Sequence, residues 1–356
     1  MASRPADKLV LVADSDRPAR RSGRSAGRAA LASTRLPPEP VRAELPQLGR
    51  DMTVAMAAHR VLKSCLLHLL DNRLPVLKGS DPEAIHQARV ALRRLRAAIA
   101  IFKSALRSEE VAFLGDEARW LAGELGPARD LDVFLAEVFE PVADACAGAE
   151  GLAAYRGAAQ QLQRQRLARA REAFRSRRFA AWRERFRSWL AADVAPPVAV
   201  VQGDPANPVG ARYRPIAVYA ADILTRRDRK MRKRGHQVTH LKPEELHNLR
   251  KSIKKLRYAA EFFGDLYDSG AGRYVKRLSR LQDVLGHFND VAVAQSLMRD
   301  IERATARDSQ AGAAISSHVH HVSGLIAGWH AAHGATARKR LRKRWRALHD
   351  TDPFWP

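Results

Sequence analysis

Hydrophobic residues recur at three- and four-residue spacing through most of this chain, and the alternation typical of β-strands is nearly absent. The pattern predicts long amphipathic helices and an all-α fold. We expect four helices in each half of the chain. Their predicted bounds are 51–74, 82–107, 109–139, 150–192, 212–234, 243–268, 271–303 and 308–348.

A proline- and glycine-rich stretch, "ADVAPPVAVVQGDPANPVGARYRP", interrupts the helical period near residue 203. It predicts a linker at 193–211 between a first helical bundle at 51–192 and a second at 212–350. Residues 1–50 carry no sustained helical pattern, so we expect a flexible, weakly basic tail there.

The two halves contain matching segments in the same order. "IHQARVALRRLRAAIAIF" at 85–102 aligns without gaps with "LHNLRKSIKKLRYAAEFF" at 246–263. After each copy comes a second block, "LAGELGPARDLDVFL" at 121–135 and "LQDVLGHFNDVAVAQ" at 281–295. Two ordered matches indicate an internal duplication, and they predict two four-helix bundles related by a pseudo-twofold axis.

The first block of each half places a basic stripe beside an apolar one. At about 100° per residue, one arc of each helix carries a histidine and three cations. These residues are His86, Arg89, Arg93 and Arg96 in the first copy, and His247, Arg250, Lys254 and Arg257 in the second. Neighbouring like charges repel by a few tenths of a kcal/mol per pair. Acidic neighbours or an anionic ligand must offset this repulsion, and repetition of the stripe favours a ligand site.

Several residues outside the stripes are expected to support that site. Asp130 and Asp290 end the second blocks, where their carboxylates could orient the arginines or histidines through charge-assisted hydrogen bonds. Lys276 and Arg280 lead into the later block and could approach the ligand. The histidines have two open roles, as switchable donors to the ligand or as partners of these carboxylates. Arg94 lies on the opposite flank of its helix, away from the stripe.

Charge and composition limit the kinds of partner that the protein can bind. The chain has 62 Lys and Arg residues against 38 Asp and Glu, a formal charge of +24, and its 46% hydrophobic content is sufficient for a substantial core. Such an excess implies an acidic partner.

No run approaches the roughly 18 apolar residues of a membrane helix, so we expect no membrane insertion. Cys65 and Cys146 are expected to be reduced core thiols in a cytoplasmic protein. The His and Asp residues lack metal-ligand spacing, so we expect no metal or cofactor.

The paired blocks resemble the CHAD family, the conserved histidine α-helical domain. Besides the two histidine-headed helices, the matching motifs are "LGPARDLDV", "LGHFNDVAV" and "LIAGWHAA", and the resemblance covers 51–350. It implies two four-helix bundles around a basic pore or groove that binds long-chain inorganic polyphosphate, and targeting to polyphosphate granules. The Glu-x-Glu-x-Lys strand pattern of the CYTH domain often fused upstream is not found, so we expect a standalone CHAD protein. Asn289 stands where the first copy has Arg129, and Ala292 where it has Asp132.

The residues themselves favour non-catalytic polyphosphate binding. No Walker loop, paired-carboxylate metal site or nucleophile arrangement occurs, so we expect no enzyme activity. Only 6% of residues are aromatic, and most of these occupy core-like positions, which disfavours base stacking on single strands. Nonspecific nucleic-acid binding by the basic surface is the alternative. A phosphohydrolase using the histidines is a third hypothesis.

Overall fold

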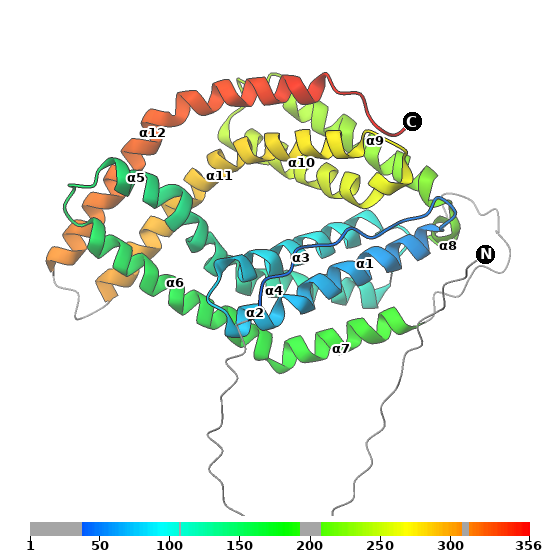
Figure 1. The fold of residues 1–356 in the computed structure, drawn as a ribbon, viewed down its shortest axis with the longest axis horizontal. Coiled ribbons are helices and arrows are strands. Elements are labelled where there is room, and N and C mark those ends of the chain that lie inside the picture. Colours follow the sequence, from blue (N-terminus) through cyan, green and yellow to red (C-terminus); the bar gives the residue numbers. More distant parts are fainter. Residues whose placement is uncertain (1–37, 107, 193–207, 308–312) are drawn as a thin grey trace, which may run out of the picture. The chain divides into compact units, whose positions relative to one another are not determined.

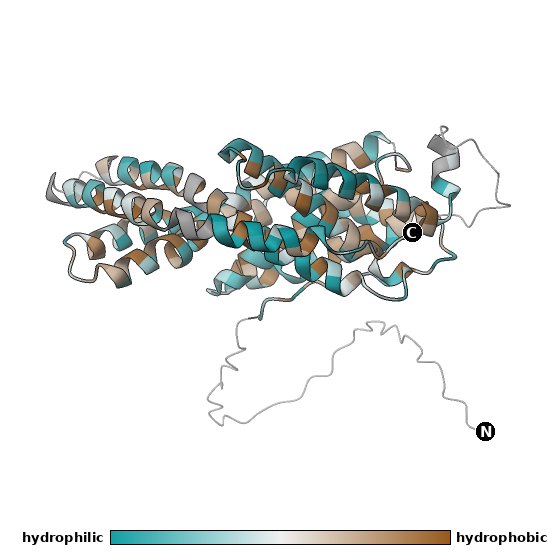
Figure 2. Ribbon diagram, turned by 90° about the horizontal axis from the view of Figure 1, so that it is seen from above, coloured by the Kyte–Doolittle hydropathy of each residue, from teal (hydrophilic) through white to brown (hydrophobic). Residues whose placement is uncertain are grey.

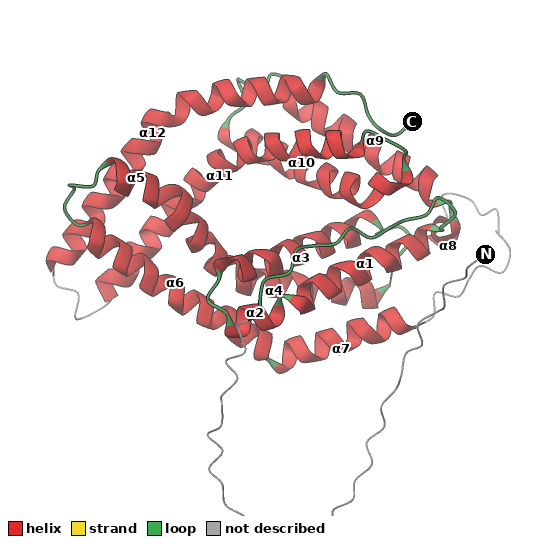
Figure 3. Ribbon diagram, in the orientation of Figure 1, coloured by secondary structure: helices red, strands yellow, loops and turns green. Residues whose placement is uncertain are grey.

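The computed structural model describes residues 38–106, 108–192, 208–307 and 313–356. Within these ranges the regular elements are helices, and a bridge between Thr53 and Pro215 is the one β-type pairing (Figure 3). The predicted all-α fold is confirmed. No helix of the described ranges has the length and apolarity needed to cross a membrane.

Most helices begin and end close to the predicted positions (Figure 1). Both histidine-headed helices start at a proline, and Asp81 caps the first of them by accepting a hydrogen bond from the Glu83 amide. The helices of the first half are α1 (Val54–Asp71), α2 (Arg73–Lys78), α3 (Pro82–Ile101), α4 (Glu109–Val133), the π-helical turn η1 (Phe134–Phe139), α5 (Glu140–Ala145), α6 (Leu152–Arg175) and α7 (Arg177–Ala191). Those of the second half are α8 (Pro208–Tyr213), α9 (Ile216–Gly235), α10 (Pro243–Phe263), the 3-10 turn η2 (Gly264–Leu266), α11 (Ala271–Arg307) and α12 (Ala313–His349).

Three predicted boundaries differ from the structure. The helix expected at 150–192 is divided at Ser176, whose extended backbone ends α6 and whose side chain caps α7. The linker expected at 193–211 contains the start of α8, whereas 193–207 lie outside the described residues. The tail expected at 1–50 is not uniform: residues 38–50 precede α1 and pack along it, where Leu48 is buried and Asn72 exchanges hydrogen bonds with the Val41 backbone. Residues 1–37 lie outside the described part.

The long helices of the two halves pack in the same order. In the first half α1 packs on α3, α3 on α4 and α4 on α6; in the second, α9 packs on α10, α10 on α11 and α11 on α12. The histidine-headed helices α3 and α10 contact each other across the halves. That the halves arose by duplication stays a prediction from the sequence.

Apolar side chains form two cores, and each draws on both halves of the chain. The larger one combines α1, α3, α4, α7 and the end of α6 with α9, α10, the first half of α11 and the end of α12, and Phe102 and Phe263 meet edge-on inside it. The smaller one joins η1, α5 and α6 to α11 and α12 around Tyr155. The cores therefore do not divide at the predicted linker. The reason is length: α11 and α12 have 37 residues each and reach from one core to the other, and besides packing on each other they also pack against α6 of the first half. Individual helices carry both hydrophilic and hydrophobic residues, as amphipathic helices should (Figure 2).

Candidate anion-binding site

Two cavities lie between the first-half helices α3 and α4 and the second-half helices α9 to α11. We call the one of about 530 Å³ the histidine chamber, and the one of about 890 Å³ the lysine chamber. The histidine chamber is lined by His86, Arg89, Arg93, Arg129, Asp130, Val133, Phe134, Glu137, Val138, Arg250, Lys254, Gln282, Asp283, Gly286, Val293 and Leu297. The lysine chamber is lined by Arg93, Arg96, Ala97, Ile99, Ala100, Lys103, Leu106, Ser108, Val111, Ala112, Gly115, Asp116, Arg119, Arg227, Lys251, Lys254, Lys255 and Tyr258.

The two chambers meet at Arg93 of α3 and Lys254 of α10, which line both of them. These two residues are equivalent positions of the two aligned copies. The structure therefore brings the basic stripes of both halves to one place. Along α3, His86 and Arg89 lie on the histidine side of this junction, and Arg96 lies on the lysine side.

A slot on α4 holds Arg89. The Arg89 guanidinium lies 3.5 Å from a carboxylate oxygen of Asp130 and donates a 3.4 Å hydrogen bond to the Ala122 carbonyl. Gly126 lies between these two partners, one turn from each. A Cβ atom at Gly126 would come within 2.6 Å of the Arg89 Nη1. Gly126 and Asp130, in the block at 121–135, thus shape a site for Arg89 of the block at 85–102.

The second half repeats part of this slot. Gly286 and Arg250, the equivalents of Gly126 and Arg89, both line the histidine chamber. The predicted orienting acid Asp290 belongs to α11, but its side chain lies outside the described residues. Its role stays a prediction.

Gly126→Ala is expected to move Arg89 without unfolding the protein. The new methyl group displaces the end of a flexible side chain, and alanine is the better helix former, so the free energy of unfolding should change by no more than about 1 kcal/mol. Affinity for an anionic ligand should fall about three- to tenfold, because one charge-assisted contact is misplaced. Urea unfolding and isothermal titration with polyphosphate measure the two effects.

Gly123→Ala is the matched control on the same helix, since a Cβ there has no neighbour within 4 Å. It should leave the affinity unchanged. Equal losses in the two variants would show that the slot does not position Arg89 for a ligand.

Lys254 is the most strongly perturbed cation of the site. Burial, followed by the positive charges of Arg93, Arg250 and Arg89 in that order, lowers its pKa to about 7. The chain thus keeps an ammonium group where its charged form is disfavoured. A negatively charged ligand at the junction would offset both causes.

His86 is half-buried in the histidine chamber. Burial lowers its pKa, Arg129 adds to the effect, and Glu83 on the same helix opposes it. His86 lines the chamber and can face a ligand there, and its pairing with a carboxylate of the second block stays a prediction.

Four predicted site residues do not line either chamber. Arg257 donates to Glu261 at 2.7 Å and to Gln282 at 3.1 Å. Its equivalent Arg96 keeps its place in the lysine chamber because Ala100 occupies the position of Glu261. His247 is exposed on α10, and Lys276 and Arg280 are exposed on α11.

Arg94 is buried away from both chambers, as its position on the helical wheel indicated. Its guanidinium lies 3.8 Å from Glu261 of α10 and over the Phe262 ring. It also donates to the Glu44 carbonyl in the segment that precedes α1. Arg94 therefore joins the halves structurally.

Sequence reasoning missed six cations of the chambers. They are Lys103, Arg119, Arg129, Arg227, Lys251 and Lys255. Lys251 and Lys255 flank Lys254 on α10, and a wider arc on the helical wheel would have included them. Arg227 belongs to a basic run that looked like solvent-exposed surface; in the structure it donates to the Lys255 carbonyl, and burial lowers its pKa to about 10.

The described residues include no group of three or more His, Cys, Asp or Glu side chains placed to hold a metal ion. Cys65 is buried, and burial raises the pKa of its thiol to about 11. Cys146 is partly buried, and both thiols are free.

The fold and the site define an all-α protein in which basic helices of both halves line shared cavities. The CHAD family model matches residues 60–299, so the chain belongs to this family. The crystal structure of the CHAD domain from the plant Ricinus communis superposes with a TM-score of 0.72 at 28% identity, covering 88% of this chain and 98% of that one. PptA from Streptomyces chartreusis has the same fold, with a TM-score of 0.55 at 18% identity over 83% of this chain and 100% of that one.

Two curated Mycobacterium tuberculosis proteins are similar in sequence. They are the uncharacterized proteins MT2285 of strain CDC 1551 / Oshkosh and Rv2226 of strain H37Rv. Each is 31% identical over 220 residues, which is 60% of this chain. The chain matches 39% of the length of each relative.

Proposed function

We propose that this protein binds long-chain inorganic polyphosphate in the two chambers without breaking it down. The observation that carries the proposal is the junction, where Arg93 of one repeat and Lys254 of the other face the same space. A linear chain of phosphates could pass from the histidine chamber through the junction into the lysine chamber. There it would meet cations from both repeats in succession.

The balance of charge supports a polyanion over a single small anion. The lysine chamber has eight Lys and Arg side chains against Asp116 alone, and Asp116 is paired with Arg119 at 2.6 Å. A chain of phosphates can contact more of these cations at once than one phosphate group can. The CHAD family membership supports the same ligand, because polyphosphate binding is what the resemblance implies.

A binding role without catalysis agrees with the chemistry of the chambers. Arginines and lysines hold phosphate oxygens well, but hydrolysis needs a nucleophile or an activated water. The acids of the histidine chamber, Asp130, Glu137 and Asp283, lie among five Lys and Arg side chains. We infer that their function is to orient these cations, as Asp130 does for Arg89, and that the protein accompanies polyphosphate granules in the cytoplasm.

Competition between polyphosphate and duplex DNA tests the proposal at near-physiological salt. Nonspecific DNA binding depends on phosphate contacts alone and weakens steeply as salt rises. Long polyphosphate should displace labelled DNA at a phosphate concentration at least about tenfold below that of unlabelled DNA. Fluorescence anisotropy gives both curves. Superimposable curves would favour the nucleic-acid alternative and contradict a site built for polyphosphate.

A further inference from the structure

The lysine chamber has an apolar wall that a phosphate chain does not need. On its α3 and α4 side, between flanking charged residues, lies an aliphatic strip formed by Ala97, Ile99, Ala100, Leu106, Val111 and Ala112. On α3 this wall continues the basic stripe directly: Arg93 and Arg96 give way to Ala97 and Ala100 along the same face. Aliphatic surface facing water is unfavourable by about 25 cal/mol per Å².

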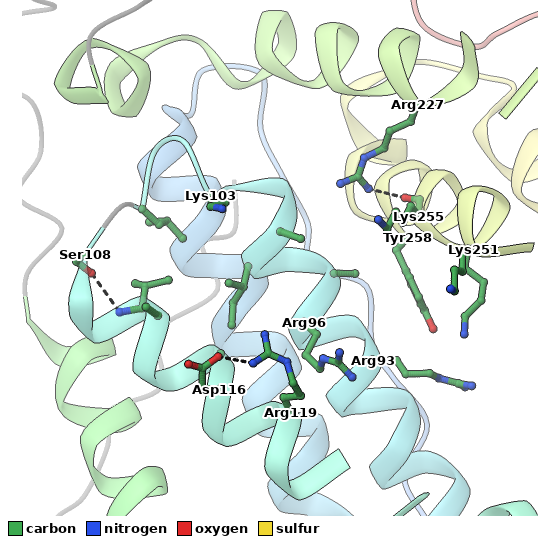
Figure 4. A pocket seen from close by; sticks show the side chains of 18 residues that line it. Arg93, Arg96, Lys103, Ser108, Asp116, Arg119, Arg227, Lys251, Lys255 and Tyr258 are labelled. Carbon is green, nitrogen blue, oxygen red and sulfur yellow. Dashed lines mark hydrogen bonds and ion pairs between the residues drawn. The ribbon is translucent and has the colours of Figure 1, made fainter. Parts of the chain in front are cut away.

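The opposite wall is cationic. Figure 4 shows Arg227, Lys251 and Lys255 on the α9 and α10 side, across from Ser108 and Asp116 of the α4 side. Lys254 and Arg93 lie where this wall meets the histidine chamber. The aliphatic groups of the lining are therefore confined to the α3 and α4 side, whereas cations stand on both sides, with Arg96, Lys103 and Arg119 at the edges of the aliphatic strip.

Two buried polar atoms at this chamber have no hydrogen-bond partner in the described part of the chain. One is the hydroxyl of Tyr258, whose side chain is 4% exposed, and the other is Nε of Arg93. A buried donor without an acceptor costs about 1–3 kcal/mol. Acceptor oxygens of a ligand at the cationic wall would remove this cost.

We propose that the lysine chamber binds a phosphorylated aliphatic molecule, with its phosphate group at the cationic wall and its hydrocarbon body along the α3 and α4 wall. The charge of the chamber selects an anionic head, and the aliphatic lining selects an apolar body. A nucleotide fits less well. The one aromatic ring of the lining belongs to Tyr258, which is buried and packed 5.0 Å from the Arg257 guanidinium, so it offers no face for base stacking.

A series of alkyl phosphates tests the apolar wall directly. We expect octyl phosphate to bind more tightly than butyl phosphate, and butyl phosphate more tightly than inorganic phosphate. A fully buried methylene gives about fourfold in affinity, so the gain from butyl to octyl should reach at least about tenfold. Isothermal titration below the micellar concentration measures each ligand. Equal affinities across the series would overturn the proposal.

A space-filling variant locates the hydrocarbon. Ala100 is exposed on α3 within the chamber wall, so Ala100→Trp fills the cavity without disturbing a core. This variant should lose most of the gain from butyl to octyl phosphate while its circular dichroism stays helical. Ala181→Trp, at an exposed position of α7 outside both chambers, is the matched control and should keep the gain. A gain that survives Ala100→Trp would show that the alkyl chain binds elsewhere.

These titrations contain no polyphosphate, so their outcome is separate from that of the proposed function. Polyphosphate should compete with octyl phosphate because both ligands need Arg93 and Lys254. If octyl phosphate binds and polyphosphate does not displace it, the two ligands do not share Arg93 and Lys254, which contradicts the proposed polyphosphate site but not the alkyl phosphate site. If polyphosphate alone binds, the aliphatic lining has no ligand role.

Discussion

Replacing Arg93 and Lys254 together by alanine is expected to weaken polyphosphate binding about 100-fold or more. Both side chains line the two chambers, so their loss interrupts the cationic path at its centre. A hydrogen bond to a charged group contributes about 1.5–3 kcal/mol, and two such residues are removed. The double variant should also lower the slope of log affinity against log salt by about 1 to 2, because fewer phosphates are contacted.

The fold should tolerate this double change. Lys254 is destabilised by burial and by Arg93, Arg250 and Arg89, so removing two of these like charges relieves repulsion. Thermal unfolding should therefore show an unchanged or higher midpoint. A lower affinity accompanied by a large loss of stability would point to misfolding instead.

Arg342→Ala with Lys343→Ala is the control for net charge. This pair also removes one arginine and one lysine, and both residues are exposed on α12, outside either chamber. The control should lose no more than about threefold in affinity, the general effect of lower net charge. Equal losses in both double variants would mean that overall charge, and not the chambers, binds polyphosphate.

Polyphosphate affinity is expected to decrease as the pH rises above 7. In the free protein the pKa of Lys254 is about 7, lowered by burial and by cations of α3 and α10. A bound polyanion raises this pKa toward the usual value of about 10.4. The complex therefore holds more protons than its separate components between these two values. The affinity is greatest below pH 7 and falls by about tenfold between pH 7 and about 8.5.

The stability of the free protein should have the opposite pH dependence. Because the folded pKa of Lys254 is depressed, the unfolded chain binds more protons from about pH 7 up to the ordinary lysine range. The contribution of Lys254 to stability therefore rises with pH across that window. Urea unfolding without ligand, at several pH values, measures it.

Lys254→Arg is the variant that tests this assignment. An arginine stays charged throughout, so the decrease in affinity above pH 7 should largely disappear. Titration in two buffers of different ionisation enthalpy should show proton uptake by the wild type near pH 8 and much less by the variant. His86, whose pKa is lowered mainly by burial, should contribute proton uptake only in more acidic solution. Undiminished uptake by Lys254→Arg would assign the proton to another group.

The sequence by itself determined the helices and the direction of the basic stripes. Periodicity, together with the prolines that open α3 and α10, placed α1, α3 and α10 within a few residues of their observed starts, because these signals depend on residues close together in the chain. The same spacing put His86, Arg89 and Arg93 on one face, and separated Arg94 from them. These are properties of a single helix, which the sequence specifies directly.

The tertiary structure decided which cations share a space. Arg257 and Arg96 are equivalent in sequence, yet of these two only Arg96 lines a chamber, because Glu261 pairs with Arg257. The same Glu261 carboxylate also lies close to Arg94, which belongs to α3. Arg227 enters the site from a run that resembled surface, because α9 packs on α10. Pairing and burial depend on neighbours from distant parts of the chain. A helical wheel describes one helix and none of its neighbours, so the two chambers and the apolar wall could be recognised only in the packed structure.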